Sequence, residues 1–176
     1  MTLEQITSQI RTILDFPKPG ILFRDMTPLL LHPEARTWLT TRLAEDFSDD
    51  GIEGVAGIEA RGFLFGISLA DALGVPFIPI RKSGKLPGRT ERESYDLEYG
   101  QAAIEIHADA VVPGQRILIH DDLLATGGTC SAAARLIRRV GGTVAGFSFL
   151  ISLEGLEGRK TLHASFPAPV RSIIRY

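Results

Sequence analysis

The chain has 176 residues, of which 44% are hydrophobic, and this composition excludes an intrinsically disordered protein and favours one compact domain. Its 19 basic and 21 acidic residues give a net charge of −2, so no overall basic field favours nucleic acid as a partner. A single cysteine, Cys130, excludes an intramolecular disulfide and fits a reducing, cytoplasmic location. The sequence contains no signal-like segment and no apolar run of about 20 residues, so we expect no membrane partner.

The first part of the chain follows no repeating pattern. Apolar residues at helical spacing predict a helix over residues 3–14, which the two prolines of FPKPG end. Pro33 then begins an amphipathic helix over residues 33–47. We expect about residues 1–35 to form a small N-terminal hood within a single domain of residues 1–176.

The rest of the chain alternates between expected strands and helices. Residues 82–99 interrupt this alternation with a polar, glycine-containing stretch that favours a long loop. Strand–helix–strand units of this length predict an α/β fold with a mainly parallel central sheet flanked by helices. Strands are expected over residues 54–59, 75–82, 102–107, 116–120, 143–153 and 170–176, and helices over residues 63–73, 130–140 and 156–164.

The most informative segment is RILIHDDLLATGGT, residues 116–129. Ligands of parallel sheets bind beyond the carboxyl ends of the strands, where we expect Asp121 and Asp122. The glycines of TGGT let a ligand approach the backbone at the start of the next helix, whose free N–H groups and dipole favour a phosphate. Thr126 and Thr129 are both suitable caps for that helix. The carboxylates suit sugar hydroxyls or a hydrated cation, and the simpler alternative is an ordinary strand–turn–helix with an acidic turn.

Other phosphate and metal motifs are missing from the sequence. No G-x-x-x-x-G-K-[ST] segment occurs, and the glycines of GIEGVAGIEARG do not match G-x-G-x-x-G. Four scattered histidines and one cysteine do not match the spacing of a structural zinc site.

RILIHDDLLATGGT closely resembles the phosphoribosyl diphosphate (PRPP) binding signature of the type I phosphoribosyltransferases. FPKPGILFRDMTPLL, GIEARGFLFG and RKSGKLPGRTERESYDLEYG are similar to the adenine-using members of that family, and the resemblance spans about residues 13–175. It implies the type I phosphoribosyltransferase fold and the transfer of the 5-phosphoribosyl group from PRPP to adenine. The products would be AMP and diphosphate, with Mg²⁺ as cofactor and an oxocarbenium-like transition state. His120 departs from the pattern, because an aliphatic residue is more usual before the two aspartates.

The resemblance also implies roles for individual residues. Catalysis would depend on Glu98 as general acid/base at adenine N7, on Arg61 at the diphosphate, and on Tyr99, which helps to close the site. Mg²⁺ is expected to bind through PRPP and water near the aspartate pair, with no metal held by side chains alone. Residues expected to bind substrate are Asp121 and Asp122 at the ribose; Ala125, Thr126, Gly127, Gly128 and Thr129 at the 5′-phosphate; Arg81, Lys82 and Lys85 in a basic segment; and Leu22, Phe23, Arg24 and Leu153 at the base.

Simpler interpretations stay open for several of these residues. Arg61 is also explained as a surface residue at a strand–helix turn, and Lys85 and Arg89 as parts of a solvated basic loop. Leu22 and Phe23 would serve equally as core residues.

The segment ERESYDLEYG, residues 91–100, is long, polar and ends in glycine, which is typical of a lid that closes over substrates. Its Tyr95, Leu97 and Tyr99 also alternate as they would on a simple strand, and the spacing fits both interpretations.

Two other functions compete with the adenine enzyme. A non-catalytic PRPP or nucleotide sensor would be expected to carry a nucleic-acid-binding element, and the sequence shows no such domain or basic face. A transferase for another base, such as xanthine or orotate, is the second. Enzymes of the family that use 6-oxopurines usually place a lysine near the last sheet segments, whereas residues 140–158 contain no lysine or arginine. Because the basic segment can serve a neighbouring subunit's site in this family, the resemblance implies a homodimer.

Overall fold

The computed structural model describes residues 1–96 and 100–176, and these form two compact units, Met1–Arg42 and Leu43–Tyr176. The N-terminal unit contains α1, the antiparallel hairpin β1–β2, the 3-10 helix η1 and most of α2. The elements of this unit are α1 (Leu3–Ser8), β1 (Arg11–Leu14), β2 (Leu22–Asp25), η1 (Thr27–Leu31) and α2 (Pro33–Asp46), the last of which continues into the second unit.

Among the described residues of both units, no helix combines the length and the apolarity that a bilayer crossing requires.

The prediction of one helix over residues 3–14 is wrong in its second half. A capping box between Thr2 and Gln5 starts α1 as a helix, but the helix ends at Ser8. Arg11–Leu14 instead pairs in antiparallel register with β2. The apolar spacing fits both structures locally, and the backbone hydrogen bonds of the hairpin decide between them.

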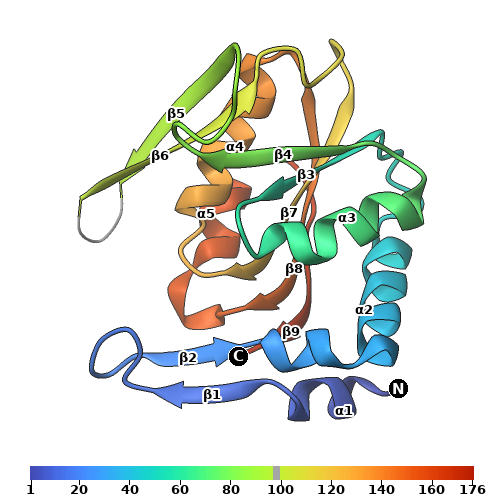
Figure 1. Ribbon diagram of the computed structural model, residues 1–176, viewed down its shortest axis with the longest axis vertical. Coiled ribbons are helices and arrows are strands. Elements are labelled where there is room, and N and C mark those ends of the chain that lie inside the picture. The colour runs from blue at the N-terminus through green and yellow to red at the C-terminus, as the bar shows by residue number, and fades with distance from the viewer. Residues whose placement is uncertain (97–99) are drawn as a thin grey trace. The chain divides into compact units, whose positions relative to one another are not determined.

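The second unit is built on a seven-stranded sheet in the order β5-β6-β4-β3-β7-β8-β9 (Figure 1). Strands β4, β3, β7, β8 and β9 run parallel, and β6 and β5 add an antiparallel hairpin at one edge. The expected α/β architecture with a mainly parallel sheet is therefore confirmed. The strands are β3 (Gly54–Ile58), β4 (Phe77–Lys82), β5 (Thr90–Asp96), β6 (Gln101–His107), β7 (Arg116–Leu124), β8 (Thr143–Ser152) and β9 (Val170–Arg175).

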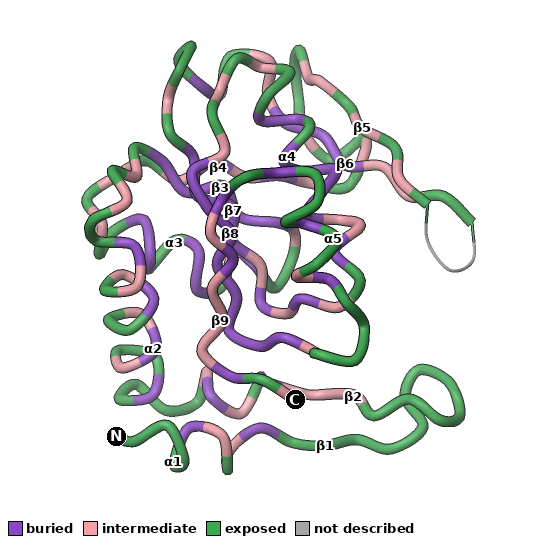
Figure 2. Tube along the Cα trace, turned by 180° about the vertical axis from the view of Figure 1, so that it is seen from behind, coloured by how far each residue is buried: buried purple, intermediate pink, exposed green. Residues whose placement is uncertain are grey.

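Helices cover both faces of this sheet, with α3 (Gly62–Leu73) on one side and α4 (Gly128–Arg139) and α5 (Gly158–Ser165) on the other (Figure 1). The alternation of side chains along β7 shows the two faces. Ile119 belongs to the core cluster that includes α4 side chains. The next residue, His120, has its ring 3.5 Å from the position that a Cβ atom would take on Gly66 of α3. Figure 2 shows the buried residues concentrated on the central strands between these layers.

Two boundaries differ from the predictions in ways that matter for the site. The expected strand over residues 116–120 continues through both aspartates to Leu124. The expected polar loop over residues 82–99 contains a regular strand, Thr90–Asp96, paired with β6. In both cases polar side chains lie on strands because the backbone hydrogen bonds of a neighbouring strand stabilise them.

Glu105 of β6 organises the turn between β4 and β5. Its side chain is only 5% exposed, and its Oε1 accepts hydrogen bonds from the backbone N–H groups of Lys85 and Leu86, each at 2.8 Å. Burial on its own raises the pKa of Glu105, but the N–H groups of residues 84–86 and the charge of Arg92 outweigh it and lower the pKa below the ordinary 4.5. A buried, charged carboxylate therefore fixes the course of the basic segment.

We expect Glu105→Gln to lower the free energy of unfolding by about 1–3 kcal/mol at neutral pH, because the carboxylate hydrogen bonds to backbone N–H groups are weakened. A folded pKa below the unfolded value means that this contribution is present above about pH 4.5 and is lost as the pH falls through the folded pKa. Thermal unfolding of both proteins at about pH 7 and about pH 3.5 measures the effect. The difference between them should shrink at the lower pH, and an equal difference at both would contradict a charged Glu105.

Glu91→Gln is the matched control, since Glu91 lies on the same β5–β6 hairpin but does not accept the Lys85 and Leu86 hydrogen bonds. It should change the free energy of unfolding by less than about 0.5 kcal/mol.

Candidate active site

Strand β7 is longer than its neighbour β3, and this difference opens the candidate site. The parallel register of the two strands runs as far as Gly57 opposite His120. Beyond that point the chain leaves β3 through residues 59–61 and enters α3, while β7 continues beside β8. Asp121 and Asp122 therefore lie within β7, next to the turn that follows β3, and not after the last residue of the strand as the sequence predicted.

A pocket of about 460 Å³ lies at this turn. The structure brings five of the predicted site residues together in its wall, and it adds Glu59 and Tyr95, for which the sequence suggested no binding role. Glu59 follows β3 directly, and an acidic residue at the carboxyl end of a parallel strand could have indicated a place in the site. The wall consists of Ile58, Glu59, Ala60, Arg61, Lys82, Tyr95, Asp121, Asp122, Leu123 and Thr129.

Arg61 and Asp122, which both line the pocket, form an ion pair with Nε 2.5 Å from Oδ2. The side chain of Asp122 is 6% exposed and that of Arg61 is 46% exposed, so the arginine neutralises a nearly buried carboxylate while much of its own surface stays accessible. Asp121 accepts the backbone N–H of Asp122 at 2.9 Å. Burial, and then the charge of Asp122, raise the pKa of Asp121 well above 3.8. A cation or several hydroxyl donors beside the pair would stabilise its charged form.

The TGGT loop leads from β7 into α4, and its two glycines have different surroundings. Gly127 is the N-cap residue of α4 and has a φ of +84°. A Cβ atom at this position would lie 3.0 Å from the carbonyl oxygen of Gly158. Gly128 has more room, since its nearest neighbours would lie 3.9 Å from a Cβ atom. Close backbone packing thus explains Gly127, while Gly128 leaves space for a ligand.

The prediction that Thr126 or Thr129 caps α4 is wrong. In the described part of the chain, no side chain caps this helix, because the left-handed backbone of Gly127 occupies the cap position. The first N–H groups of α4 are therefore without a side-chain cap at the end that follows the aspartate pair.

Glu59 holds the basic segment that follows β4. Its Oε2 accepts hydrogen bonds from Arg81 Nε at 3.1 Å and from the backbone N–H of Lys82 at 3.0 Å. Burial acts to raise the pKa of Glu59, but these hydrogen bonds and the charges of Arg81 and Lys82 lower it overall. Arg81 also donates to the carbonyl oxygen of Lys85 at 2.9 Å. The three predicted basic residues therefore differ: Arg81 supports the turn, Lys82 lines the pocket, and Lys85 is exposed.

His120 and Cys130 lie close to the site but are fully or almost fully buried. The Nδ1 atom of His120 is 3.2 Å from the hydroxyl of Ser148, and burial lowers the pKa of this histidine to about 4. Burial, followed by the charge of Asp121, raises the pKa of the Cys130 thiol. At neutral pH both side chains are uncharged, so neither supplies an ionised acid, base or nucleophile.

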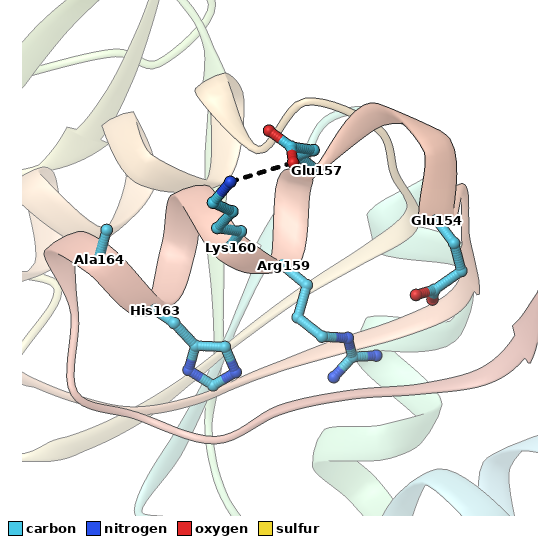
Figure 3. Close-up of a pocket in the computed structure, with 6 residues that line it drawn as sticks. All are labelled: Glu154, Glu157, Arg159, Lys160, His163 and Ala164. Carbon is cyan, nitrogen blue, oxygen red and sulfur yellow. Dashed lines mark hydrogen bonds and ion pairs between the residues drawn. The ribbon is translucent and has the colours of Figure 1, made fainter.

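Leu153 lies beside the end of β7, where its N–H donates to the carbonyl oxygen of Leu124 at 2.9 Å. It caps η2 (Glu154–Leu156), and η2 and α5 line a second pocket of about 680 Å³ (Figure 3). In this view Lys160 points back toward Glu157, with the charged atoms 3.1 Å apart. None of the predicted site residues is among those drawn around this pocket, which are Glu154, Glu157, Arg159, Lys160, His163 and Ala164.

The predicted base-binding residues Leu22, Phe23 and Arg24 lie on β2 of the N-terminal unit. Phe23 packs edge to face against Phe16 with ring centroids 5.0 Å apart, and Arg24 donates to the hydroxyl of Thr12. Leu22 is 51% exposed, which disfavours its interpretation as a core residue.

Two further predicted residues, Glu98 and Tyr99, lie outside the described residues, and Ala125 precedes the TGGT loop as a partly buried residue.

Comparison with known proteins gives a consistent result. The family model of the phosphoribosyl transferase domain matches residues 32–166. The adenine phosphoribosyltransferase of Thermobifida fusca is 55% identical over 157 residues, which is 89% of each chain. That of Sorangium cellulosum is 49% identical over 176 residues, covering 99% of this chain and 88% of the relative.

Solved structures show the same relationship. The adenine phosphoribosyltransferase of Thermoanaerobacter pseudethanolicus superposes with a TM-score of 0.95 at 48% identity, covering 99% of this chain and 100% of the other. The enzyme of Saccharomyces cerevisiae, solved with adenine and an imino-altritol bisphosphate, has a TM-score of 0.89 at 36% identity and 97% coverage of both chains. By sequence and by structure, the chain belongs to the phosphoribosyltransferase family.

Proposed function

We propose that this protein transfers the 5-phosphoribosyl group from PRPP to adenine and releases AMP and diphosphate. The observation that carries the proposal is the pocket in which Arg61, Lys82, Asp121, Asp122 and Thr129 meet. It provides cations, paired carboxylates and an uncapped helix start within one space. The identity of about half of all positions with relatives named adenine phosphoribosyltransferase supports adenine as the base.

The ribose 5-phosphate part of PRPP is assigned to the aspartate pair and the TGGT loop. Carboxylates accept hydrogen bonds from neighbouring sugar hydroxyls, and Asp121 and Asp122 lie side by side in the pocket wall. The first N–H groups of α4, the space beside Gly128 and the Thr129 hydroxyl suit the 5′-phosphate.

The diphosphate end is assigned to Arg61 and Lys82. As the bond between the ribose C1 and the diphosphate oxygen breaks, the leaving group gains negative charge, while adenine N9 forms the new bond to C1 and the base loses one proton. Fixed cations next to the leaving oxygen stabilise this charge in the transition state. Arg61 and Lys82 both line the pocket; the guanidinium of Arg61 is held by Asp122, and the backbone of Lys82 is held by Glu59.

Mg²⁺ fits this site as an ion held mainly by substrate. Among residues 1–96 and 100–176, no group of three or more histidine, cysteine, aspartate or glutamate side chains is arranged to hold a metal. Mg²⁺ binds proteins through one or two carboxylates, several waters and substrate phosphates. Asp121 and Asp122 match that donor set, and the ion would supply charge neutralisation at PRPP.

The base is assigned to the remaining predicted residues by family resemblance. Leu22, Phe23 and Arg24 would present backbone groups to the adenine edge, and Leu153 would cover one ring face. Glu98 would manage the proton at adenine N7, with Tyr99 helping to exclude water that would hydrolyse PRPP.

We further propose a cytoplasmic homodimer in which the basic segment serves the neighbouring subunit's site. Lys85 and Arg89 are exposed and so are accessible to a second copy. Sedimentation analysis tests the dimer, and a monomer with full activity would contradict this assignment.

The purified protein with PRPP and Mg²⁺ should form AMP from adenine, and no nucleotide from hypoxanthine, xanthine or orotate. Separation of the products by chromatography measures this, and EDTA should stop the reaction. Turnover of another base without AMP formation would overturn the adenine assignment. Binding of PRPP without turnover of any base would indicate a sensor.

Asp122→Asn should raise the KM for PRPP by about tenfold or more with a smaller effect on the KM for adenine, because it removes a charged acceptor and leaves Arg61 without its carboxylate. Steady-state kinetics with each substrate varied in turn measures both constants. Asp109→Asn, on the exposed Asp109 away from the pocket wall, is the control. Equal changes in the two constants would argue against a role at the ribose.

Glu98→Gln should lower kcat by at least about tenfold with little change in PRPP affinity, because the amide cannot exchange a proton with adenine N7. Single-turnover and steady-state rates measure the effect, and Glu91→Gln should leave them unchanged. A wild-type kcat in the Glu98 variant would remove this residue from the acid/base role.

A further inference from the structure

Strand β5 is tied to helix α4 by one carboxylate. The Oε1 atom of Glu93 accepts a hydrogen bond from Arg135 Nε at 2.5 Å, and its Oε2 atom accepts one from the guanidinium of Arg139. Arg139 also donates to the backbone carbonyl of Arg92 at 2.5 Å. Both arginines lie on α4 one turn apart, so one face of the helix holds one point of the strand.

At its other end the same strand reaches the TGGT loop, residues 126–129, which is the proposed phosphate loop. The carbonyl oxygen of Asp96 lies 3.9 Å from the position that a Cβ atom would take on Gly128. Glu93 and Tyr95 share one face of β5, since they are two residues apart. Tyr95 packs against the core cluster and lines the 460 Å³ pocket together with Thr129. β5 therefore runs along α4, from the arginine pair to the first residue of the helix.

The Glu93 contact is strong compared with a surface ion pair. The Glu93 side chain is 13% exposed, and each of its oxygens has its own arginine partner. Burial acts to raise the pKa of Glu93, but the two arginines lower it overall. The strand needs such a tie, because β5 is the edge strand of the sheet and pairs through its backbone with β6. β6 in turn is joined to the rest of the sheet through β4, with Arg81 opposite Glu105 and Lys82 opposite Ile104.

We propose that Glu93 is a positioning residue that holds Tyr95 beside the phosphate loop and thereby sets the affinity for the phosphorylated ribose. The inference rests on the proposed function for the identity of the ligand. Glu93 belongs neither to the signature segment nor to the pocket wall. It acts through the placement of β5 and does not itself reach the pocket.

The test uses Glu93→Gln with Glu91→Gln as matched control, which makes the same change on the same strand outside the arginine contact. Calorimetry measures the Kd of ribose 5-phosphate, and kinetics measures both KM values and kcat. We expect Glu93→Gln to weaken ribose 5-phosphate binding and to raise the KM for PRPP by at least about threefold, with the KM for adenine changed less. The control should match the wild-type protein in all of them.

A double-mutant cycle shows whether Glu93 acts through Tyr95. If it does, Glu93→Gln should add little to the loss of ribose 5-phosphate affinity already caused by Tyr95→Ala. Additive losses would overturn the proposed route, and so would a Glu93 variant that melts at a lower temperature but binds ribose 5-phosphate as the wild type does. A wild-type protein that binds ribose 5-phosphate but makes no AMP would instead contradict the proposed function, and the two failures are distinguishable.

Discussion

The site depends on the unequal lengths of two adjacent parallel strands. β3 stops at Ile58, whereas β7 continues to Leu124, so the polar residues of β7 face the turn that leads into α3. A carboxylate as enclosed as Asp122 is costly unless a positive charge neutralises it. Arg61, at the start of α3, supplies that charge because the turn brings it to within 2.5 Å. The same geometry that creates the pocket thus pairs its charges.

Acidic residues organise the basic ones around this pocket. Glu59 fixes Arg81 and the backbone of Lys82, and Glu105 fixes the backbone of residues 85–86. Outside the pocket wall, Glu93 joins β5 to the two arginines of α4. For each of these three glutamates, hydrogen bonds and nearby positive charges lower the pKa against the opposing effect of burial. The backbone that carries Lys82 is therefore held in place before a ligand arrives, which reduces the reorganisation that binding requires.

Much of the architecture was predictable from local pattern. The buried runs that became β3, β8 and β9, and the helical spacing of α2 and α3, were identified in the right order and close to their true ends. Prediction failed where two structures share one pattern. Residues 11–14 have helical spacing but pair as a strand, and residues 90–96 are polar but pair with β6. The partner strand decides such cases, and it lies elsewhere in the chain.

The candidate site, like the fold, was predictable from the sequence only in part. The signature of residues 116–129 and the segments that accompany it were sufficient to predict the family, because the signature consists of residue types at fixed short spacings. The same segments predict a phosphate site at the TGGT loop and a ribose site at the aspartate pair. The sequence by itself also determined which residues bring charge: Arg61, Lys82, Asp121 and Asp122. Only the tertiary structure decided that Glu59 and Tyr95 join them, that Gly127 rather than a threonine caps α4, and that Arg81 supports a turn. These outcomes depend on where separate strands end relative to one another, and that relation is set by packing in three dimensions.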